Sequence, residues 1–157
     1  MKKQITLELN NETRTLEVQP NDILLDVLRE NLGVKSPKIG CERGDCGACT
    51  ILLDGKTVRS CLILAIEADG HEIVTVEGLS KGSLTPVQQV MLEHNSFQCG
   101  FCAPGVVLAA TELLGENPHP TERDIKEALS GNLCRCTGYQ SIIEAIVDVQ
   151  KKAPKSL

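Results

Sequence analysis

The chain has 157 residues, a net charge of −5 and a pI near 5.2, with 41% hydrophobic and 24% charged residues. This acidic, ordinary composition offers no basic patch for nucleic acid or an anionic membrane surface, and no apolar run approaches the length of a bilayer span. The N-terminus carries no apolar secretion signal, so we expect a cytoplasmic protein whose thiols stay reduced.

The first half predicts a small α+β unit that begins with a hairpin. Apolar and polar residues alternate over 5–9 and again near 16–18, on either side of a turn at 10–12. A helix is expected next, with Asn21 as its N-cap and Gly33 after its end. Its apolar residues recur at helical spacing: Ile23, Leu24, Val27, Leu28 and Leu32.

A loop with three of the eight cysteines follows this helix. Together with one cysteine downstream, they form a C-x4-C-x2-C-x11-C set: Cys41, Cys46, Cys49 and Cys61. This is the plant-type spacing for a [2Fe–2S] cluster. The small residues in the loop allow its backbone to approach an anionic cluster and turn N–H groups toward it. Disulfides are typical of short secreted chains, which this chain does not resemble.

Two further strands are expected after the loop. Residues 50–53 predict a strand with a turn at Asp54-Gly55, and residues 73–76 predict a last strand that Gly78 closes. Residues 80–83 are a candidate linker, so the sequence predicts domains at 1–79 and 84–157.

The second half predicts only helices. A capping box with proline at its second position, Thr85-Pro86-Val87-Gln88, opens a helix to about His94. Three more helices are expected: 104–114 before Gly115, 122–129 capped by Thr121, and about 140–151.

The other four cysteines precede two of these helices. They are two close pairs, Cys99 with Cys102 and Cys134 with Cys136. Two helix N-termini at one site would favour an anionic ligand. A [2Fe–2S] cluster and a zinc ion held by four thiolates both fit that description, so zinc stays open for this set. All three aromatic residues lie near these cysteines and predict an apolar wall: Phe97, Phe101 and Tyr139.

Three segments resemble the cysteine motifs of the molybdenum hydroxylases, the xanthine oxidase family. They are GCERGDCGACT at 40–50, QCGFCAPG at 98–105 and GNLCRCTGY at 131–139. Ala103 is a departure, since many members carry Thr or Ser there. The resemblance implies a β-grasp ferredoxin-like domain and a four-helix bundle, each with one [2Fe–2S] cluster.

In that family, such a chain is the electron-transfer subunit. The resemblance implies a large partner with molybdopterin and, in most members, a medium partner with FAD. The cluster on Cys99, Cys102, Cys134 and Cys136 would lie nearest the pterin, which Gln98 would contact, and the other cluster would face the flavin.

No active site of its own is expected. The chain has no nucleotide-binding glycine motif, and its histidines show no catalytic pattern and are interpreted as surface residues: His71, His94 and His119. Two other interpretations remain: a free two-cluster ferredoxin that docks transiently, and a structural zinc protein. The helical half with Gln98 and its C-x-C motif favours the subunit.

Overall fold

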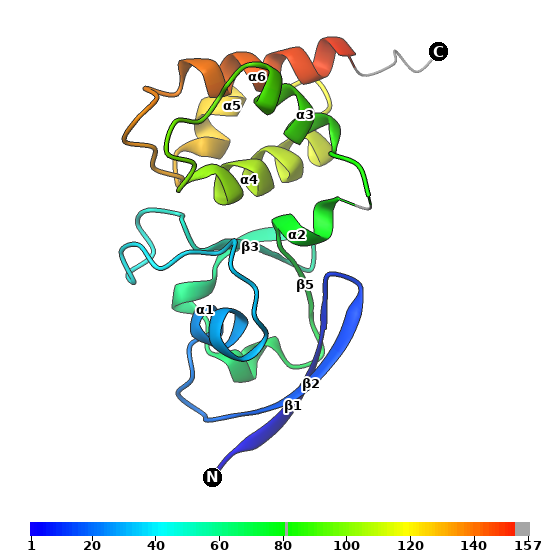
Figure 1. Ribbon diagram of the computed structural model, residues 1–157, viewed down its shortest axis with the longest axis vertical. Helices are drawn as coiled ribbons and strands as arrows, with labels where there is room; N and C mark the ends of the chain where they lie inside the picture. Colours follow the sequence, from blue (N-terminus) through cyan, green and yellow to red (C-terminus); the bar gives the residue numbers. More distant parts are fainter. Residues whose placement is uncertain (81, 153–157) are drawn as a thin grey trace.

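The computed structural model describes residues 1–80 and 82–152. The expected linker includes Lys81 and the expected second domain includes 153–157, so these parts of the two predictions lie outside the described residues. The element order confirms a mixed sheet in the first half, followed by helices in the second (Figure 1).

The first half is built on a five-stranded sheet with the order β2-β1-β5-β3-β4. β1 (Lys3–Leu9) and β2 (Glu12–Val18) form the predicted antiparallel hairpin, and β5 (Glu72–Val74) lies parallel to β1. β3 (Thr50–Leu53) pairs antiparallel with both β5 and β4 (Lys56–Arg59). Asp54 and Gly55 form the predicted turn between β3 and β4, both with positive φ.

The predicted first helix is present but starts later than expected. It consists of α1 (Leu24–Asp26) and a π-helical turn, Val27–Asn31. The Asn21 prediction was wrong, because Ile23 is the N-cap. Ile23 also forms a bridge with Leu64, and Asn21 lies in a turn that the Gln19 N–H closes on Asp22 Oδ2 (2.7 Å). Gly33 follows the helix with φ +73°, as expected.

The end of β5 corrects a second prediction. The strand stops at Val74, and the chain turns into a short helix that the sequence did not predict, α2 (Val76–Leu79). The Thr75 N–H donates to the side-chain Oδ1 of Asn10 (2.9 Å), which takes it out of the sheet. Gly78 therefore lies inside α2 and does not close the strand. A Cβ there would lie 2.2 Å from Asn10 Oδ1.

Four helices form the second half: α3 (Pro86–Glu93), α4 (Ala103–Glu116), α5 (Glu122–Leu129) and α6 (Gln140–Lys152). Both predicted caps are confirmed, since Thr85 and Thr121 accept from the N–H groups of Gln88 and Asp124. The predicted end of α4 before Gly115 was wrong. Gly115 does not adopt a positive φ, and the helix ends at Glu116 with Asn117 as its C-cap, whose N–H donates to Leu113 O (2.8 Å).

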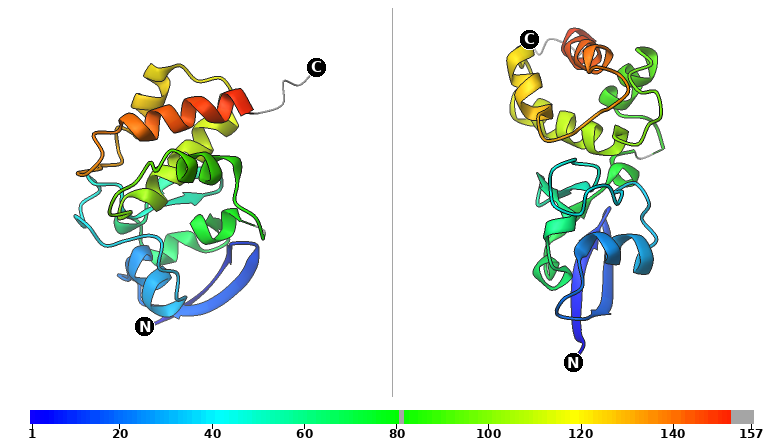
Figure 2. Two further views of the ribbon diagram at one scale, coloured as in Figure 1. Left: turned by 45° about the horizontal axis from the view of Figure 1, so that its top comes forward. Right: turned by 90° about the vertical axis from the view of Figure 1, so that its left-hand side faces the viewer.

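Each half has its own hydrophobic core. One core packs α1 and its π-helical turn on the sheet, around Ile5, Leu28 and Ile73. The other lies among α3–α6, around Val106, Ile125 and Ile146. The four helices are stacked on the end of the sheet that carries β3 and β4 (Figures 1 and 2). Among the described residues, no helix combines the length and the apolarity needed to cross a bilayer.

Side chains of α4 tie the two halves together at β4. Glu112 accepts a hydrogen bond from the Thr57 N–H (2.9 Å) and lies 3.7 Å from Lys56 Nζ, which also pairs with Glu116. Cys102 is the N-cap of α4, so the loop that carries it lies at the opposite end of this helix from Glu112 and Glu116.

Candidate metal centres

The first cysteine set brings its four sulfurs together as two pairs. The loop 41–49 lies between the π-helical turn and β3, and Cys61 sits in a 3-10 turn after β4. The Cys46 N–H donates to Cys41 Sγ (3.4 Å), and the thiols of these two cysteines are neighbours. The thiols of Cys49 and Cys61 are also neighbours, since each lies close enough to affect the other's pKa. The four sequence-predicted residues are therefore neighbours in space.

The two pairs differ in their electrostatic environment. Backbone N–H groups of Arg43 and Cys46 point at the Cys41 sulfur and lower its pKa to about 6. Burial, and then the neighbouring Cys49 thiol, raise the pKa of Cys61 to about 11. A buried thiolate at Cys61 needs a cation to compensate its charge, which a bound iron would provide.

The second set is also arranged in two pairs, and each pair joins the loop before α4 to the loop before α6. Cys136 Sγ lies 3.6 Å from Cys99 Sγ, with both residues exposed. Cys102, which is the N-cap of α4, has the half-buried Cys134 thiol as its neighbour. The pairs therefore cross between motifs and do not follow the C-x2-C and C-x-C spacings.

Hydrogen bonds and burial act in opposite directions on these thiols. Burial, followed by the Cys134 neighbour, raises the pKa of Cys102 to about 12. Burial also tends to raise the pKa of Cys134. Hydrogen bonds from Thr137 Oγ1 (3.1 Å) and from the N–H groups of Cys136 and Thr137 outweigh burial, so the pKa of Cys134 is lowered. The Phe101 N–H and the Cys136 thiol lower the pKa of Cys99.

The pairing fits a two-iron cluster. A [2Fe–2S] cluster takes four cysteines, two on each iron, and N–H groups directed at sulfur stabilise the anionic thiolates. A single tetrahedral ion would need all four sulfurs around one point. The donor set and its N–H groups are those that a [2Fe–2S] cluster uses.

The two cysteine loops touch each other directly. The Leu133 N–H donates to Cys46 O (2.9 Å). The Asn132 side chain, with 2% of its surface exposed, donates from Nδ2 to Gly47 O and Thr50 Oγ1 (both 3.1 Å). Arg59 donates to Thr50 Oγ1 (2.9 Å) and Gly131 O (2.6 Å). A hydrogen-bonded contact therefore connects the residues beside one set with those beside the other.

Glycine is required at this contact. Gly47 has φ +71°, and a Cβ there would lie 2.2 Å from Gly131 O. A Cβ on Gly105, in the first turn of α4, would lie 2.5 Å from Gly47 O. The sequence indicated that the small residues of the loop allow its backbone to approach a cluster. Gly47 instead allows the close contact between the two halves.

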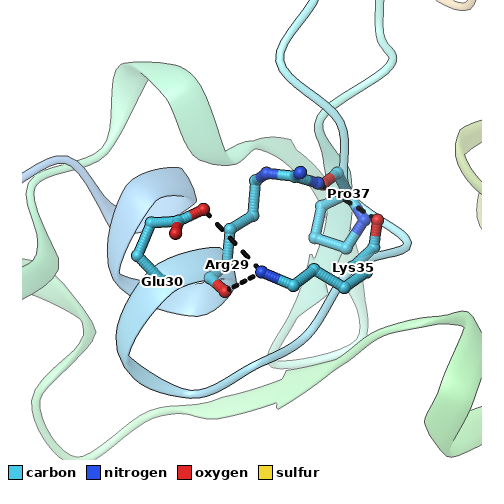
Figure 3. Close-up of polar contacts among 4 residues, drawn as sticks. All are labelled: Arg29, Glu30, Lys35 and Pro37. Atoms are coloured by element: carbon cyan, nitrogen blue, oxygen red, sulfur yellow. Dashed lines mark hydrogen bonds and ion pairs between the residues drawn. The ribbon is translucent and has the colours of Figure 1, made fainter.

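A basic side chain holds the segment that leads into the first loop. Arg29 donates from Nη1 to Lys35 O (3.1 Å) and Pro37 O (2.7 Å), and Lys35 Nζ donates back to Arg29 O (2.6 Å) (Figure 3). Lys35 also pairs with Glu30 at 3.8 Å. These bonds fix the chain just before Lys38 and Cys41.

Gln98 and the aromatic residues surround the second set. Gln98 is exposed, and its Nε2 donates to Cys136 O (3.1 Å). Phe97 and Tyr139 pack against the helical core as part of the expected apolar wall, whereas Phe101 is 45% exposed. The Tyr139 hydroxyl accepts from the Cys134 N–H (2.8 Å) and donates to Asn132 O (3.1 Å).

The histidines lie away from both sets. His71 pairs with Asp54 on the surface (2.6 Å), and His119 is exposed. His94 corrects the surface interpretation, since it is partly buried and its Nε2 lies 2.9 Å from Asp148 Oδ2. This contact joins the end of α3 to α6.

Sequence reasoning missed the residues that connect the sites. The sequence patterns predict no role for Asn132, Arg59 or Lys38. Two sequence features hint at this contact: an asparagine inside a cysteine motif, whose amide needs hydrogen-bond partners if it is buried, and a glycine that lies outside any predicted turn.

Comparisons with known proteins agree with this geometry. The family described as "2Fe-2S iron-sulfur cluster binding domain" matches residues 7–76, and the family described as "[2Fe-2S] binding domain" matches residues 75–147. The nicotine 6-hydroxylase small subunit of Paenarthrobacter nicotinovorans is 53% identical over 92% of this chain and 88% of its own length.

Two further relatives cover most of the chain. The nicotinate dehydrogenase small FeS subunit of Eubacterium barkeri is 48% identical over 90% of this chain and 91% of its own. The crystal structure of quinoline 2-oxidoreductase from Pseudomonas putida 86 contains a chain with 48% identity and a TM-score of 0.92, covering 96% of this chain and 94% of that one.

Proposed function

Since this chain belongs to the small iron–sulfur subunits of the molybdenum hydroxylases, the xanthine dehydrogenase family, we propose that each half holds one [2Fe–2S] cluster. The chain is the electron-transfer subunit of a multi-subunit oxidoreductase and not its catalytic subunit. We infer that the sheet half is a β-grasp domain and the helical half a four-helix bundle.

All eight cysteines serve as ligands in this proposal. Cys41 and Cys46 hold one iron of the first cluster, and Cys49 and Cys61 hold the other. The second cluster is held by Cys99 with Cys136 and by Cys102 with Cys134. The sorting of each set into two pairs of thiols is the observation that carries this assignment. When bound, each cluster supplies a site for one electron.

The rest of the chain fixes these ligands and their surroundings. N–H groups of the first loop stabilise the Cys41 thiolate, and Thr137 and Tyr139 hold the loop around Cys134. Burial of Cys49, Cys61 and Cys102 keeps water from one side of each site. These residues determine how well an added negative charge is tolerated.

We infer that the face with Gln98, Cys99 and Cys136 meets the large, molybdopterin-binding partner. These three residues are exposed, and the nearby apolar side chains of Phe101 and Leu133 are 45% and 55% exposed. Uncovered apolar groups beside exposed ligands suit a surface that a partner subunit covers. Gln98 would contact the pterin from this face, and a medium FAD-binding partner would lie nearer the first cluster.

Iron and acid-labile sulfide analysis of the purified chain tests the ligand assignment. We expect two irons and two sulfides per cluster, four of each per chain. Stoichiometric zinc without sulfide would overturn the assignment. Native mass spectrometry on protein from its own source tests the partners, because a lasting complex is expected and a free ferredoxin would be isolated alone.

A further inference from the structure

Lys38 stands between the two cysteine sites. Its backbone N–H donates to Ala48 O (2.9 Å), inside the first cysteine loop. Its Nζ lies 5.6 Å from the centre of the Phe101 ring, a residue between Cys99 and Cys102. The main chain of Lys38 thus belongs to the first site, while its ammonium group lies over the ring of a residue in the loop of the second.

The ammonium group is poorly compensated. Lys38 is partly buried, and its Nζ donates to Ser36 O (3.3 Å). Within residues 1–80 and 82–152 it takes part in none of the ion pairs. Burial, and then the charge of Arg29, lower its pKa, whereas Glu77 and Cys102 raise it.

We propose that Lys38 raises the reduction potential of the cluster on Cys99, Cys102, Cys134 and Cys136, and does so more than for the cluster on Cys41, Cys46, Cys49 and Cys61. This inference rests on the proposed function. Lys38 acts through space: it contacts no reacting atom, and no bond or proton changes hands. The single electron comes from the reduced partner or, in a titration, from dithionite.

The physical reason is the charge that reduction adds. A cluster that accepts an electron gains one negative charge, and a partly desolvated cation nearby lowers the free energy of that state. For a unit charge roughly 10 Å away at a protein-like dielectric constant, the effect on the equilibrium is roughly tenfold. For a one-electron couple, a tenfold change corresponds to about 59 mV.

This arrangement makes the second site dependent on the first half of the chain. The loop that presents Lys38 is held by Arg29 and by Ala48, both of which belong to the sheet half. The helical half alone has no cation at this position. The potential of its cluster therefore depends on the contact between the halves.

The test uses the complete chain with both clusters, titrated electrochemically and followed by electron paramagnetic resonance of each cluster. Lys38→Met removes the charge and keeps the length, whereas Lys38→Arg keeps the charge. Lys2→Met is the matched control, since Lys2 pairs with Glu17 at the β1–β2 hairpin (3.7 Å) and takes no part in the bonds that hold Lys38. We expect Lys38→Met to favour the oxidised second cluster roughly tenfold, with little change in the first, and both other variants to resemble the parent protein.

The possible results distinguish a failure of this inference from a failure of the proposed function. An unchanged second cluster in Lys38→Met, an equal shift of both clusters, or a shift in Lys38→Arg as large as in Lys38→Met would overturn the role of Lys38. A parent chain without iron and sulfide would instead overturn the proposed function. Lys38→Gln is the second neutral variant. If neither neutral variant retains both clusters while Lys2→Met does, Lys38 is a structural residue and the inference is wrong.

Discussion

The Leu133 N–H donates to the carbonyl of Cys46 at 2.9 Å, so the peptide beside a cysteine of the second set is hydrogen-bonded to a cysteine of the first. Asn132 and Arg59 reinforce this link on either side. The two sites are thus held in one fixed contact, although each half has its own core.

Gly47→Ala should destabilise the protein more than Gly55→Ala. Both glycines have positive φ, so each alanine carries a backbone cost of about 1–2 kcal/mol. Nothing lies within 4 Å of a Cβ at Gly55, whereas a Cβ at Gly47 would clash with Gly131 O. Urea unfolding of the two variants measures the difference. Equal losses would show that the contact between the loops adds nothing to stability.

Tyr139→Phe should perturb the second site and leave the first intact. The variant removes the hydroxyl that accepts from the Cys134 N–H and donates to Asn132 O. We expect a loss of stability of about 1 kcal/mol and an altered paramagnetic resonance signal from one cluster only. Phe97→Leu, which changes an aromatic residue of the same core without a hydrogen bond, is the control. Changes in both cluster signals would contradict a local role.

Glu77→Gln should weaken the protein at neutral pH but not in acid. The Glu77 carboxylate accepts from the Ser36 N–H (3.0 Å) and from the hydroxyls of Ser36 and Thr75. Burial acts to raise the pKa of Glu77, but these hydrogen bonds dominate and lower it below 4.5.

Because the folded state has the lower pKa, its stabilisation is fully present above the unfolded value near 4.5 and is lost as the pH falls through the folded value. Urea unfolding at a series of pH values, with iron content checked at each, measures the difference in the free energy of unfolding between parent and variant. This difference should disappear only as the pH falls below about 4.5. If the difference already disappeared near neutral pH, the ionised Glu77 carboxylate would not be its cause.

Magnetic coupling should identify which site faces the molybdenum centre. In the assembled complex, we expect the cluster on Cys99, Cys102, Cys134 and Cys136 to couple more strongly to paramagnetic molybdenum, because Gln98 and the exposed Cys99 share that face. Cys99→Ser should reduce the coupled signal, with Cys41→Ser as the matched variant at the other site. Strong coupling assigned to the other cluster would reverse the proposed orientation.

Local patterns predicted most of the elements. The alternation of β1 and β2, the capping boxes at Thr85 and Thr121 and the turn at Asp54-Gly55 depend on neighbours in the sequence. Two of the wrong predictions concern positions where a residue distant in the sequence determines the end of an element. Asn10 ends β5 by binding the Thr75 N–H, and the Ile23–Leu64 bridge shifts the start of α1.

The cysteines could be grouped by spacing, but their pairing could not. Cys99 is paired with Cys136 and Cys102 with Cys134, across two loops that only the packing of the four helices on one another brings together. The roles of Asn132 and Lys38 depend in the same way on the contact between the halves. No local pattern marks a residue whose partner lies in the other half.

The Glu112 carboxylate has a consequence for solubility. β4 is an outermost strand of the sheet, and an outermost strand with free N–H groups is a template on which another chain can add a strand. Glu112 occupies the Thr57 N–H, and Lys56 and Glu116 place charges beside it. The side chains that join the two halves thereby also protect this edge from aggregation.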